Sequence, residues 1–265
     1  MKIAIAQINS TIGDFDGNSD KIVDAWRHAD EAGAELIVLP ELALCGYPPR
    51  DLLAKPAFLR QNQVALDRLA KRGGRAVAVV GYASVNETNS GRPARNSAAV
   101  LRDGQVAALR HKTLLPTYDV FDEDRYFEPA TDNTPVEILG KKIGITICED
   151  IWNDEVFLND RRYGRSPTDE LTGGGAELLL NLSASPWSLG KEHSRHVLLS
   201  QLSATAGCAV VYCNLVGGND ELVFDGGSQY YNGHGVLGAS GAMFAEDLLL
   251  VDTETIEPNS GDTSD

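Results

Sequence analysis

The sequence predicts an α/β fold in which two mixed β-sheets pack against each other with helices outside. Three observations lead to this prediction. Short apolar runs alternate with helical periodicity over residues 1–100, hairpins follow, and a second βα stretch occupies residues 177–214. The chain has 265 residues, of which 43% are hydrophobic, so it can bury the core of one compact domain.

The first hundred residues contain two kinds of apolar pattern. Short apolar runs predict strands at residues 2–7, 35–39 and 76–82. Between these runs, apolar residues recur every three or four positions and predict helices around residues 18–32 and 57–72. The alternation of strand and helix is typical of an α/β fold.

Hairpins inserted among the βα units indicate that the sheets are mixed. Strand-like runs at residues 97–102 and 105–110 flank Asp103-Gly104, a dipeptide that supplies the positive φ of a tight turn. A second turn, at Gly140, joins two more predicted strands. The elements predicted after the first hairpin are strands at residues 136–139, 142–147, 177–182 and 209–214 and a helix at residues 191–206.

We expect one domain over residues 1–256 and a disordered tail over residues 257–265. The tail is polar, contains Pro, Gly and Ser, and has no apolar face with which to pack.

The charge of the chain argues against nucleic acid and membrane as partners. Acidic residues outnumber basic ones by 38 to 23, the excess is spread along the chain, and there is no basic block. No stretch approaches the roughly 20 apolar residues that span a bilayer. Residues 1–6 read as the start of a strand and not as a secretory leader, so we expect a cytoplasmic protein.

The cysteines predict neither a disulfide framework nor a zinc site. There are four, irregularly spaced and without paired CxxC motifs, at positions Cys45, Cys148, Cys208 and Cys213. We expect no metal and no organic cofactor.

Three reactive side chains follow predicted strands or turns. Cys148 comes directly after the alternating isoleucines of residues 143–147, at the point where polar residues begin. Glu41 follows the second predicted strand, and Lys112 follows the second strand of the hairpin at Asp103. Singly, these residues could be a small hydrophobe, a helix-start carboxylate and a surface cation. Strand ends can also bring such groups together at one rim of a sheet.

Together, the three groups suit the cleavage of an unactivated amide. That reaction needs a nucleophile, a base that returns its proton to the departing amine, and a donor for the oxyanion. A free thiol is only partly ionised at neutral pH, so Cys148 requires Glu41 as base and benefits from the positive charge of Lys112. The backbone N–H of Glu149 could share the oxyanion with Lys112.

These residues resemble the Glu-Lys-Cys triad of the nitrilase (carbon-nitrogen hydrolase) superfamily. Longer motifs are similar to the glutaminase domain of glutamine-dependent NAD synthetases, and the resemblance covers nearly the whole chain. These motifs are LPELALCGYPPRDLL at 39–53, VFDEDRYF at 120–127, ICEDIW at 147–152, NLSASP at 181–186 and NLVGGNDELVFDGGS at 214–228.

The resemblance implies a four-layer αββα sandwich, a thioester intermediate on the cysteine and a homo-oligomer. It implies that Glu123 is a second glutamate beside the triad and that L-glutamine, or a similar small amide, is the substrate. The residues that it places in contact with glutamine are Tyr118, Glu149, Trp152, Ser185 and Lys191. The sequence lacks the Ser-Gly-Gly-x-Asp-Ser loop of the family's ATP-using domain. We therefore expect ammonia transfer to a synthetase partner supplied in trans, or to a domain outside this sequence.

Two other functions remain open on the sequence alone. The chain could be a free-standing nitrilase-type amidase that acts on another small carboxamide, in which case ion pairs from Glu149 and Lys191 to the substrate would be absent. It could also be an idle scaffold subunit. The presence of all three triad residues argues against a scaffold, which has no chemical need for them.

Overall fold

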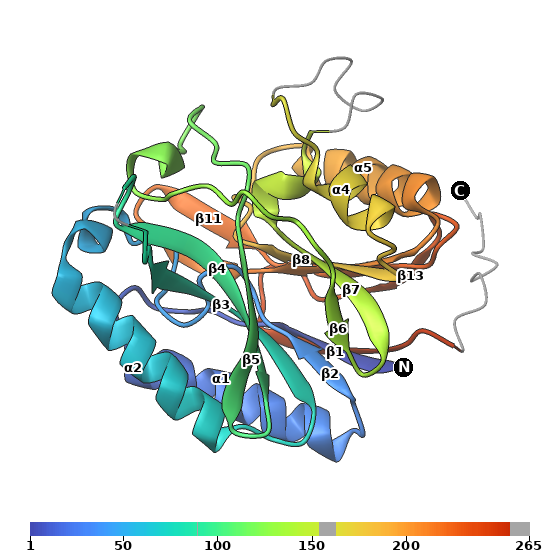
Figure 1. Ribbon diagram of the computed structural model, residues 1–265. Helices are drawn as coiled ribbons and strands as arrows, with labels where there is room; N and C mark the ends of the chain where they lie inside the picture. Colours follow the sequence, from blue (N-terminus) through green and yellow to red (C-terminus); the bar gives the residue numbers. More distant parts are fainter. Residues whose placement is uncertain (89, 154–162, 255–265) are drawn as a thin grey trace.

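Two six-stranded sheets pack face to face in the computed structural model, which describes residues 1–88, 90–153 and 163–254. Helices cover the outer faces of both sheets (Figure 1). The predicted four-layer αββα sandwich is thereby confirmed. The predicted disordered tail lies outside the described residues. The helices are α1 Phe15–Glu31, α2 Pro56–Arg72, α4 Pro167–Gly173 and α5 Lys191–Ala206.

Each sheet has three parallel strands at its centre and antiparallel strands at its sides. The first sheet has the order β14-β1-β2-β3-β4-β5, and β1, β2 and β3 are parallel. Its strands are β14 Asp247–Asp252, β1 Lys2–Gln7, β2 Leu36–Val38, β3 Val77–Val85, β4 Ala94–Arg102 and β5 Gln105–His111.

The second sheet repeats this plan. Its order is β13-β12-β9-β8-β7-β6, with β7, β8 and β9 parallel. Its strands are β13 Leu237–Ser240, β12 Gln229–Tyr231, β9 Ala209–Asn214, β8 Leu178–Ser183, β7 Lys141–Ile147 and β6 Val136–Ile138. A separate hairpin joins β10 Val216–Asn219 and β11 Leu222–Asp225.

Strand alternation builds the core between the sheets. Ile143, Ile145 and Ile147 on β7 are all buried in one cluster with Ile3 and Ile5 on β1. Successive side chains of a strand point to opposite faces, so the residues between these isoleucines face outward, as Ala4 and Ala6 of β1 do toward the helices. Separate apolar clusters lie under α1 and α2 on one side and under α4 and α5 on the other.

The predicted elements up to residue 214 are present, with ends that shift by a few residues. Asp103 and Gly104 both have positive φ, as the first hairpin requires, and so do Leu139 and Gly140 in the second. The sequence predicts no strand after residue 214, whereas the structure has five. Those strands have three to six residues and include glycines, so the alternating pattern that marks a strand is too short to read.

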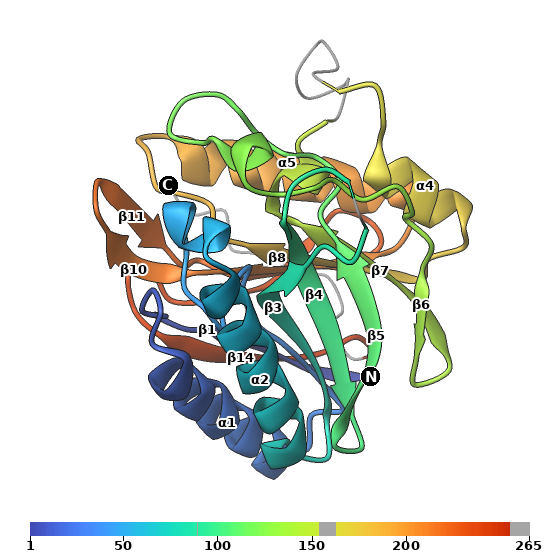
Figure 2. The ribbon, with the colours of Figure 1, turned by 60° about the vertical axis from the view of Figure 1, so that its left-hand side comes forward.

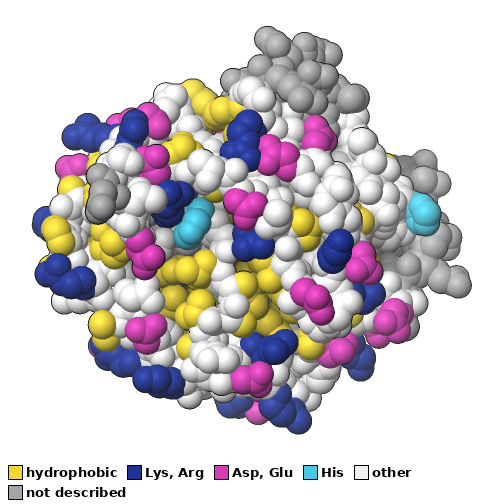
Figure 3. Space-filling model, in the orientation of Figure 1, with side chains coloured by type: hydrophobic (Ala, Val, Ile, Leu, Met, Phe, Trp, Pro, Cys, Tyr) yellow, Lys and Arg dark blue, Asp and Glu magenta, His cyan; other side chains and the backbone are white. Residues whose placement is uncertain are grey.

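Charges of both signs are interspersed on the face of the molecule shown in Figure 3, and apolar side chains gather near the edge strands β5 and β6. Helix α2 lies over β3, and the outer faces of β4 and β5 continue beyond it (Figure 2). In the parts of the chain that the structure describes, no helix is long and apolar enough to cross a membrane.

Candidate active site

Cys148 lies at the carboxyl end of β7, where the chain leaves the sheet. It is the first residue of a short 3₁₀ helix, Cys148–Ile151, and its φ is 44°. This left-handed conformation is strained for a residue with a side chain, and such strain is concentrated at functional sites. The sharp turn ends the strand and places the cysteine at the sheet edge.

Glu41 reaches the same edge from β2 in the other sheet. It is fully buried. Its Oε1 accepts a hydrogen bond from Asn96 Nδ2 at 2.7 Å, and its Oε2 accepts one from the backbone N–H of Ala184 at 2.9 Å. Ala184 follows β8 of the second sheet, so this carboxylate joins the two sheets.

Gly81 on β3 makes room for the segment that carries Glu41. A Cβ at this position would lie 2.2 Å from the carbonyl oxygen of Pro40 and 2.5 Å from the backbone nitrogen of Leu42. Real atoms do not approach so closely, so only glycine allows this contact.

We expect Gly81→Ala to displace Glu41. Overpacking of this kind costs about 1–3 kcal/mol of folding free energy. A shift of about 1 Å in a reacting group lowers a rate by about 100-fold. Urea denaturation and the turnover rate together measure both effects. Gly164→Ala is the control, because a Cβ at Gly164 meets nothing within 4 Å; equal behaviour of the two variants would refute this account of Gly81.

Lys112 lies between two carboxylates at the end of β5. Its Nζ donates to Glu41 Oε1 at 2.7 Å and to Glu123 Oε1 at 2.9 Å, and its side chain is fully buried. Burial alone would lower the pKa of Lys112, but Glu123 and Glu41 raise it well above its usual value. The ammonium is therefore a permanent positive charge at this site.

Glu123 begins the 3₁₀ helix Glu123–Arg125 and, like Glu41, accepts a hydrogen bond from Lys112. Its Oε1 also accepts from the hydroxyl of Tyr47 at 2.8 Å. Burial raises the pKa of Glu123 to about 7, the charge of Glu41 adds to this rise, and Lys112 opposes it. Two buried carboxylates around one ammonium therefore hold a proton near neutral pH.

The raised pKa of Glu123 predicts that stability falls as the pH rises. An unfolded Glu titrates near 4.3, so between about pH 4.5 and pH 7 the folded protein binds more protons than the unfolded chain. The free energy of unfolding then decreases with rising pH, in total by about 3 kcal/mol. Urea denaturation at several pH values should show this slope, and Glu123→Gln should make it less steep, most clearly between pH 6 and pH 7, above the pKa of about 6 of the buried Asp150 carboxyl. The control Glu137→Gln, at an exposed position of β6, should retain it; a slope unchanged in Glu123→Gln would contradict the assignment.

The Cys148 thiol is protonated at rest. Its burial raises the pKa of the thiol well above the ordinary value, Glu41 raises it further, and Lys112 lowers it. Among the described residues the thiol makes no hydrogen bond. The charge of Lys112 is thus insufficient to ionise the resting thiol.

Asp150 links the end of β7, just before Cys148, to the residues that follow Lys112. Its Oδ1 accepts from the backbone N–H groups of Thr113 at 3.0 Å and Leu114 at 2.8 Å, and its Oδ2 accepts from that of Ile147 at 2.9 Å. Burial raises its pKa to about 6 despite these bonds. This residue lies two positions after Cys148 but was not among the predicted site residues.

A cavity of about 150 Å³ opens beside Cys148. All five residues that the resemblance places against the substrate line it, together with Cys148 and one residue that was not predicted, Phe121. The predicted lining residues are Tyr118, Glu149, Trp152, Ser185 and Lys191. Ser185 is held by a hydrogen bond from its backbone N–H to Asn214 Oδ1 at 2.9 Å.

The cavity is lined by one carboxylate and one ammonium. Both oxygens of Glu149 accept from the Tyr118 hydroxyl at 2.9 Å, and the Tyr163 hydroxyl donates to Oε1 at 3.0 Å. Lys191 Nζ lies 5.6 Å from the ring centre of Trp152, and burial lowers the pKa of this lysine. Within the described ranges no carboxylate lies at ion-pair distance from Lys191.

Several residues of the site could not be found from the sequence. Asn96, which orients Glu41, lies in a segment whose visible pattern is that of a strand. Tyr47 lies in the motif at 39–53, but nothing in that motif indicates its contact with Glu123. Asp150 could have been found, because a carboxylate two residues after Cys148 in a strand-ending turn is well placed to accept backbone N–H groups. Among the described residues, no three His, Cys, Asp or Glu side chains form a group that could hold a metal ion.

The sequence is similar to those of carbon-nitrogen hydrolases and of glutamine-dependent NAD(+) synthetases. The family model of carbon-nitrogen hydrolases matches residues 2–256. A glutamine-dependent NAD(+) synthetase of Synechocystis sp. is 44% identical over 253 residues, which are 94% of this chain and 45% of the relative. That of Thermotoga maritima is 40% identical, over 97% of this chain and 42% of the relative. The resemblance read from the motifs is confirmed.

Solved structures share the fold. The glutamine-dependent NAD+ synthetase of Acinetobacter baumannii, in complex with ADP, is 36% identical with a TM-score of 0.85, over 96% of this chain and 46% of that chain. An amidase from Nesterenkonia sp. is 24% identical with a TM-score of 0.79, over 95% of this chain and 89% of that chain. The chain spans less than half the length of the synthetases that it matches.

Proposed function

The chain belongs to the carbon-nitrogen hydrolase family, and from this premise we propose that it hydrolyses the side-chain amide of L-glutamine. Cys148 is the nucleophile, Glu41 the base and Lys112 the donor to the oxyanion. The observation that carries the proposal is the cavity beside Cys148, which is lined by one ammonium and one carboxylate.

The first half of the reaction releases ammonia. Glu41 takes the thiol proton while the sulfur of Cys148 bonds to the amide carbon, and the carbonyl oxygen becomes an oxyanion. Lys112 Nζ and the backbone N–H of Glu149 stabilise that charge, because the first N–H groups of a helix have no partner within it. Glu41 then gives its proton to the amine, the C–N bond breaks, and a thioester remains.

The second half restores the enzyme. Water attacks the thioester carbon while Glu41 takes a proton from it, and Lys112 again holds the oxyanion. The C–S bond breaks, glutamate leaves, and the proton on Glu41 returns to the thiolate of Cys148. The buried position of Glu41, with its carboxylate held by Asn96 and Ala184, keeps the base in place for both halves.

The cavity suits a small α-amino acid amide. Its volume of about 150 Å³ is below the roughly 300 Å³ at which sites for drug-sized ligands begin. Lys191 pairs with the α-carboxylate of the substrate and Glu149 with the α-ammonium, while Tyr118 and Trp152 contact its methylene groups. In the described part of the chain Lys191 has no carboxylate at ion-pair distance, so an ion pair with the α-carboxylate of the substrate stabilises its charge most.

We further propose that the ammonia passes to a synthetase. Support comes from the names of the relatives, which are glutamine-dependent NAD(+) synthetases more than twice as long as the matched segment. The acceptor would therefore be reached through a partner or through another part of a longer protein.

Release of ammonia tests the proposal. The purified protein is given L-glutamine, L-asparagine and acetamide, and ammonia is measured enzymatically. We expect glutamine to have the highest kcat/KM. Preference for acetamide would indicate a free-standing amidase instead, and an absence of release from all three amides would contradict hydrolysis by this chain alone.

Lys191→Met is expected to separate glutamine binding from chemistry. Loss of the ion pair to the α-carboxylate should raise KM for glutamine by about 10- to 100-fold, from the 1.5–3 kcal/mol of a charge-assisted hydrogen bond. Turnover of acetamide, which has no carboxylate, should change little. Lys141→Met, at an exposed position of β7, is the matched control. An equal loss for glutamine and acetamide would assign Lys191 a structural role.

A further inference from the structure

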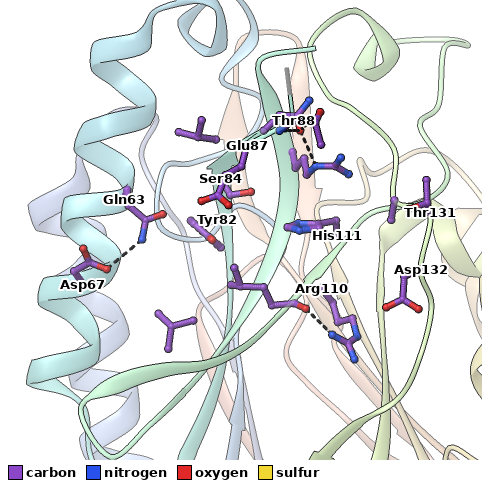
Figure 4. Close-up of a pocket in the computed structure, with 16 residues that line it drawn as sticks. Gln63, Asp67, Tyr82, Ser84, Glu87, Thr88, Arg110, His111, Thr131 and Asp132 are labelled. Atoms are coloured by element: carbon purple, nitrogen blue, oxygen red, sulfur yellow. Dashed lines mark hydrogen bonds between the residues drawn. The ribbon is translucent and has the colours of Figure 1, made fainter. Parts of the chain in front are cut away.

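A second and larger cavity lies on the outer side of the first sheet. Its volume is about 610 Å³. Helix α2 with Gln63 and Asp67 forms one wall, and the segment with Thr131 and Asp132 forms the opposite wall, with Tyr82 and His111 between them (Figure 4). It shares no lining residue with the cavity beside Cys148.

Two arginines line this cavity without a carboxylate partner among the described residues. Arg95 donates to Asn86 Oδ1 at 3.2 Å and to the carbonyl oxygen of Pro129 at 2.9 Å. Arg110 donates to the carbonyl oxygens of Thr134 at 2.8 Å and of its own neighbour Leu109 at 2.7 Å. These neutral acceptors fix both guanidinium groups and leave their charge uncompensated. Fixed cations of this kind are the usual partners of carboxylates and phosphates.

A chain of hydroxyl groups and an imidazole lies beside the arginines. His111 Nδ1 is 2.7 Å from Ser97 Oγ, which is in turn 2.7 Å from Ser84 Oγ. Burial lowers the pKa of His111 to about 4, and the charges of Arg95 and Arg110 contribute. The imidazole is therefore neutral at pH 7, and when Ser97 donates to Nδ1, the second ring nitrogen of His111 can donate to a ligand.

Two acidic residues of the cavity accept hydrogen bonds from residues close to them in the sequence. Asp67 on α2 accepts from Gln63, and Asp132 accepts from the backbone N–H and hydroxyl of Thr134. Glu87 follows β3. The charges that act on His111 are those of the arginines and not of these carboxylates. The cavity thus has a basic region near His111 and acidic walls, which would repel a ligand with several negative charges.

We propose that this cavity binds a small organic anion, with its carboxylate or phosphate held by Arg95 and His111. The apolar part of the ligand lies against Tyr82, Val106 and Leu109, which also line the cavity.

The strand geometry makes this site separate from the proposed active site. Arg95 lines the outer cavity and Ser97 contacts His111 of that cavity, whereas Asn96 between them donates to Glu41 in the interior. In the same way His111 lies outside and Lys112 inside. Successive residues of a strand point to opposite faces. The sheet therefore separates the outer ligand from Cys148, and that ligand is not the substrate.

The titration of His111 tests the proposal directly. Imidazole signals are followed by NMR against pH at low salt, with and without inorganic phosphate, phenyl phosphate or benzoate at millimolar concentration. An anion bound beside the ring favours its charged form, so the pKa of His111 should rise by at least about one unit. The exposed His234 serves as the internal control. A response to the phosphates alone or to benzoate alone supports the site and identifies the anionic group.

Two arginine variants complete the test. Arg95→Gln should remove the anion-induced shift of His111. Arg102→Gln should retain it, because Arg102 lies on the same strand but is exposed and pairs with Asp103. If none of the three anions moves the titration of His111 more than that of His234, the proposal fails. It also fails if the shift persists in Arg95→Gln. The wild-type titration decides even if this variant does not fold, and it is independent of any catalytic activity.

Discussion

Replacement of Cys148 by alanine is expected to abolish amide hydrolysis, with a loss of kcat of about 10⁴-fold or more. The thioester cannot form without the sulfur, and no other cysteine can take its place. Cys45 and Cys208 are buried in other apolar clusters, and Cys213, which shares the core cluster of Cys148, does not line the cavity. The fold should survive, because the thiol makes no hydrogen bond within the described residues and alanine removes one atom. Ammonia release measures the first effect and thermal denaturation the second.

Cys208→Ala is the matched control for this variant. Cys208 is also buried but lies under α5, so its loss should cost some stability and no activity. Ammonia release retained in Cys148→Ala would exclude Cys148 as the nucleophile. A loss of activity in both variants would indicate that stability, and not chemistry, is being measured.

Lys112→Met should have the largest combined effect on stability and activity. Removal of one partner from a buried ion pair costs about 3–5 kcal/mol, because charge is left in the interior without compensation. Here Glu41 and Glu123 would face each other across the space of the lost ammonium. Turnover should also disappear, since the oxyanion loses its charged donor, a loss of about 10²- to 10³-fold in kcat from that contact alone.

The two effects can be separated by a double variant. In Lys112→Met with Glu123→Gln, only one buried carboxylate remains, so part of the stability should return while turnover stays low. Lys71→Met, on the exposed side of α2, is the control for loss of a lysine. Stability unchanged in Lys112→Met would show that the ammonium is not required to hold the two carboxylates.

The triad could be predicted from the sequence because its members follow strands that run in the same direction. Parallel strands end at one edge, so Glu41 after β2 and Cys148 after β7 had to lie near the ends of their sheets. Strand β5 is antiparallel to β4, which is antiparallel to β3, so Lys112 also reaches this edge. The local pattern and the chain order therefore predict that these three residues lie at the ends of their strands, and their catalytic roles stay a proposal.

The residues around the triad could not be predicted in the same way. Asn96 donates to a carboxylate 55 positions earlier, and Tyr47 to one 76 positions later. Such contacts depend on how two sheets stack, which no local pattern encodes. The same holds for the outer cavity, where Arg95 and His111 meet only because β4 and β5 pair in this register. The protonated state of Cys148 likewise follows from burial, which is visible only in the folded chain.

The most direct test of the central claim, that Cys148 attacks an amide of glutamine shape, is covalent labelling with a glutamine analogue. The protein is treated with the chloroketone analogue of L-glutamine, with and without L-glutamine, and the modified residue is located by peptide mass spectrometry. We predict a single adduct on Cys148, formed more slowly in the presence of glutamine than in the presence of acetamide. No adduct on Cys148, or an adduct that glutamine does not protect, would contradict the account.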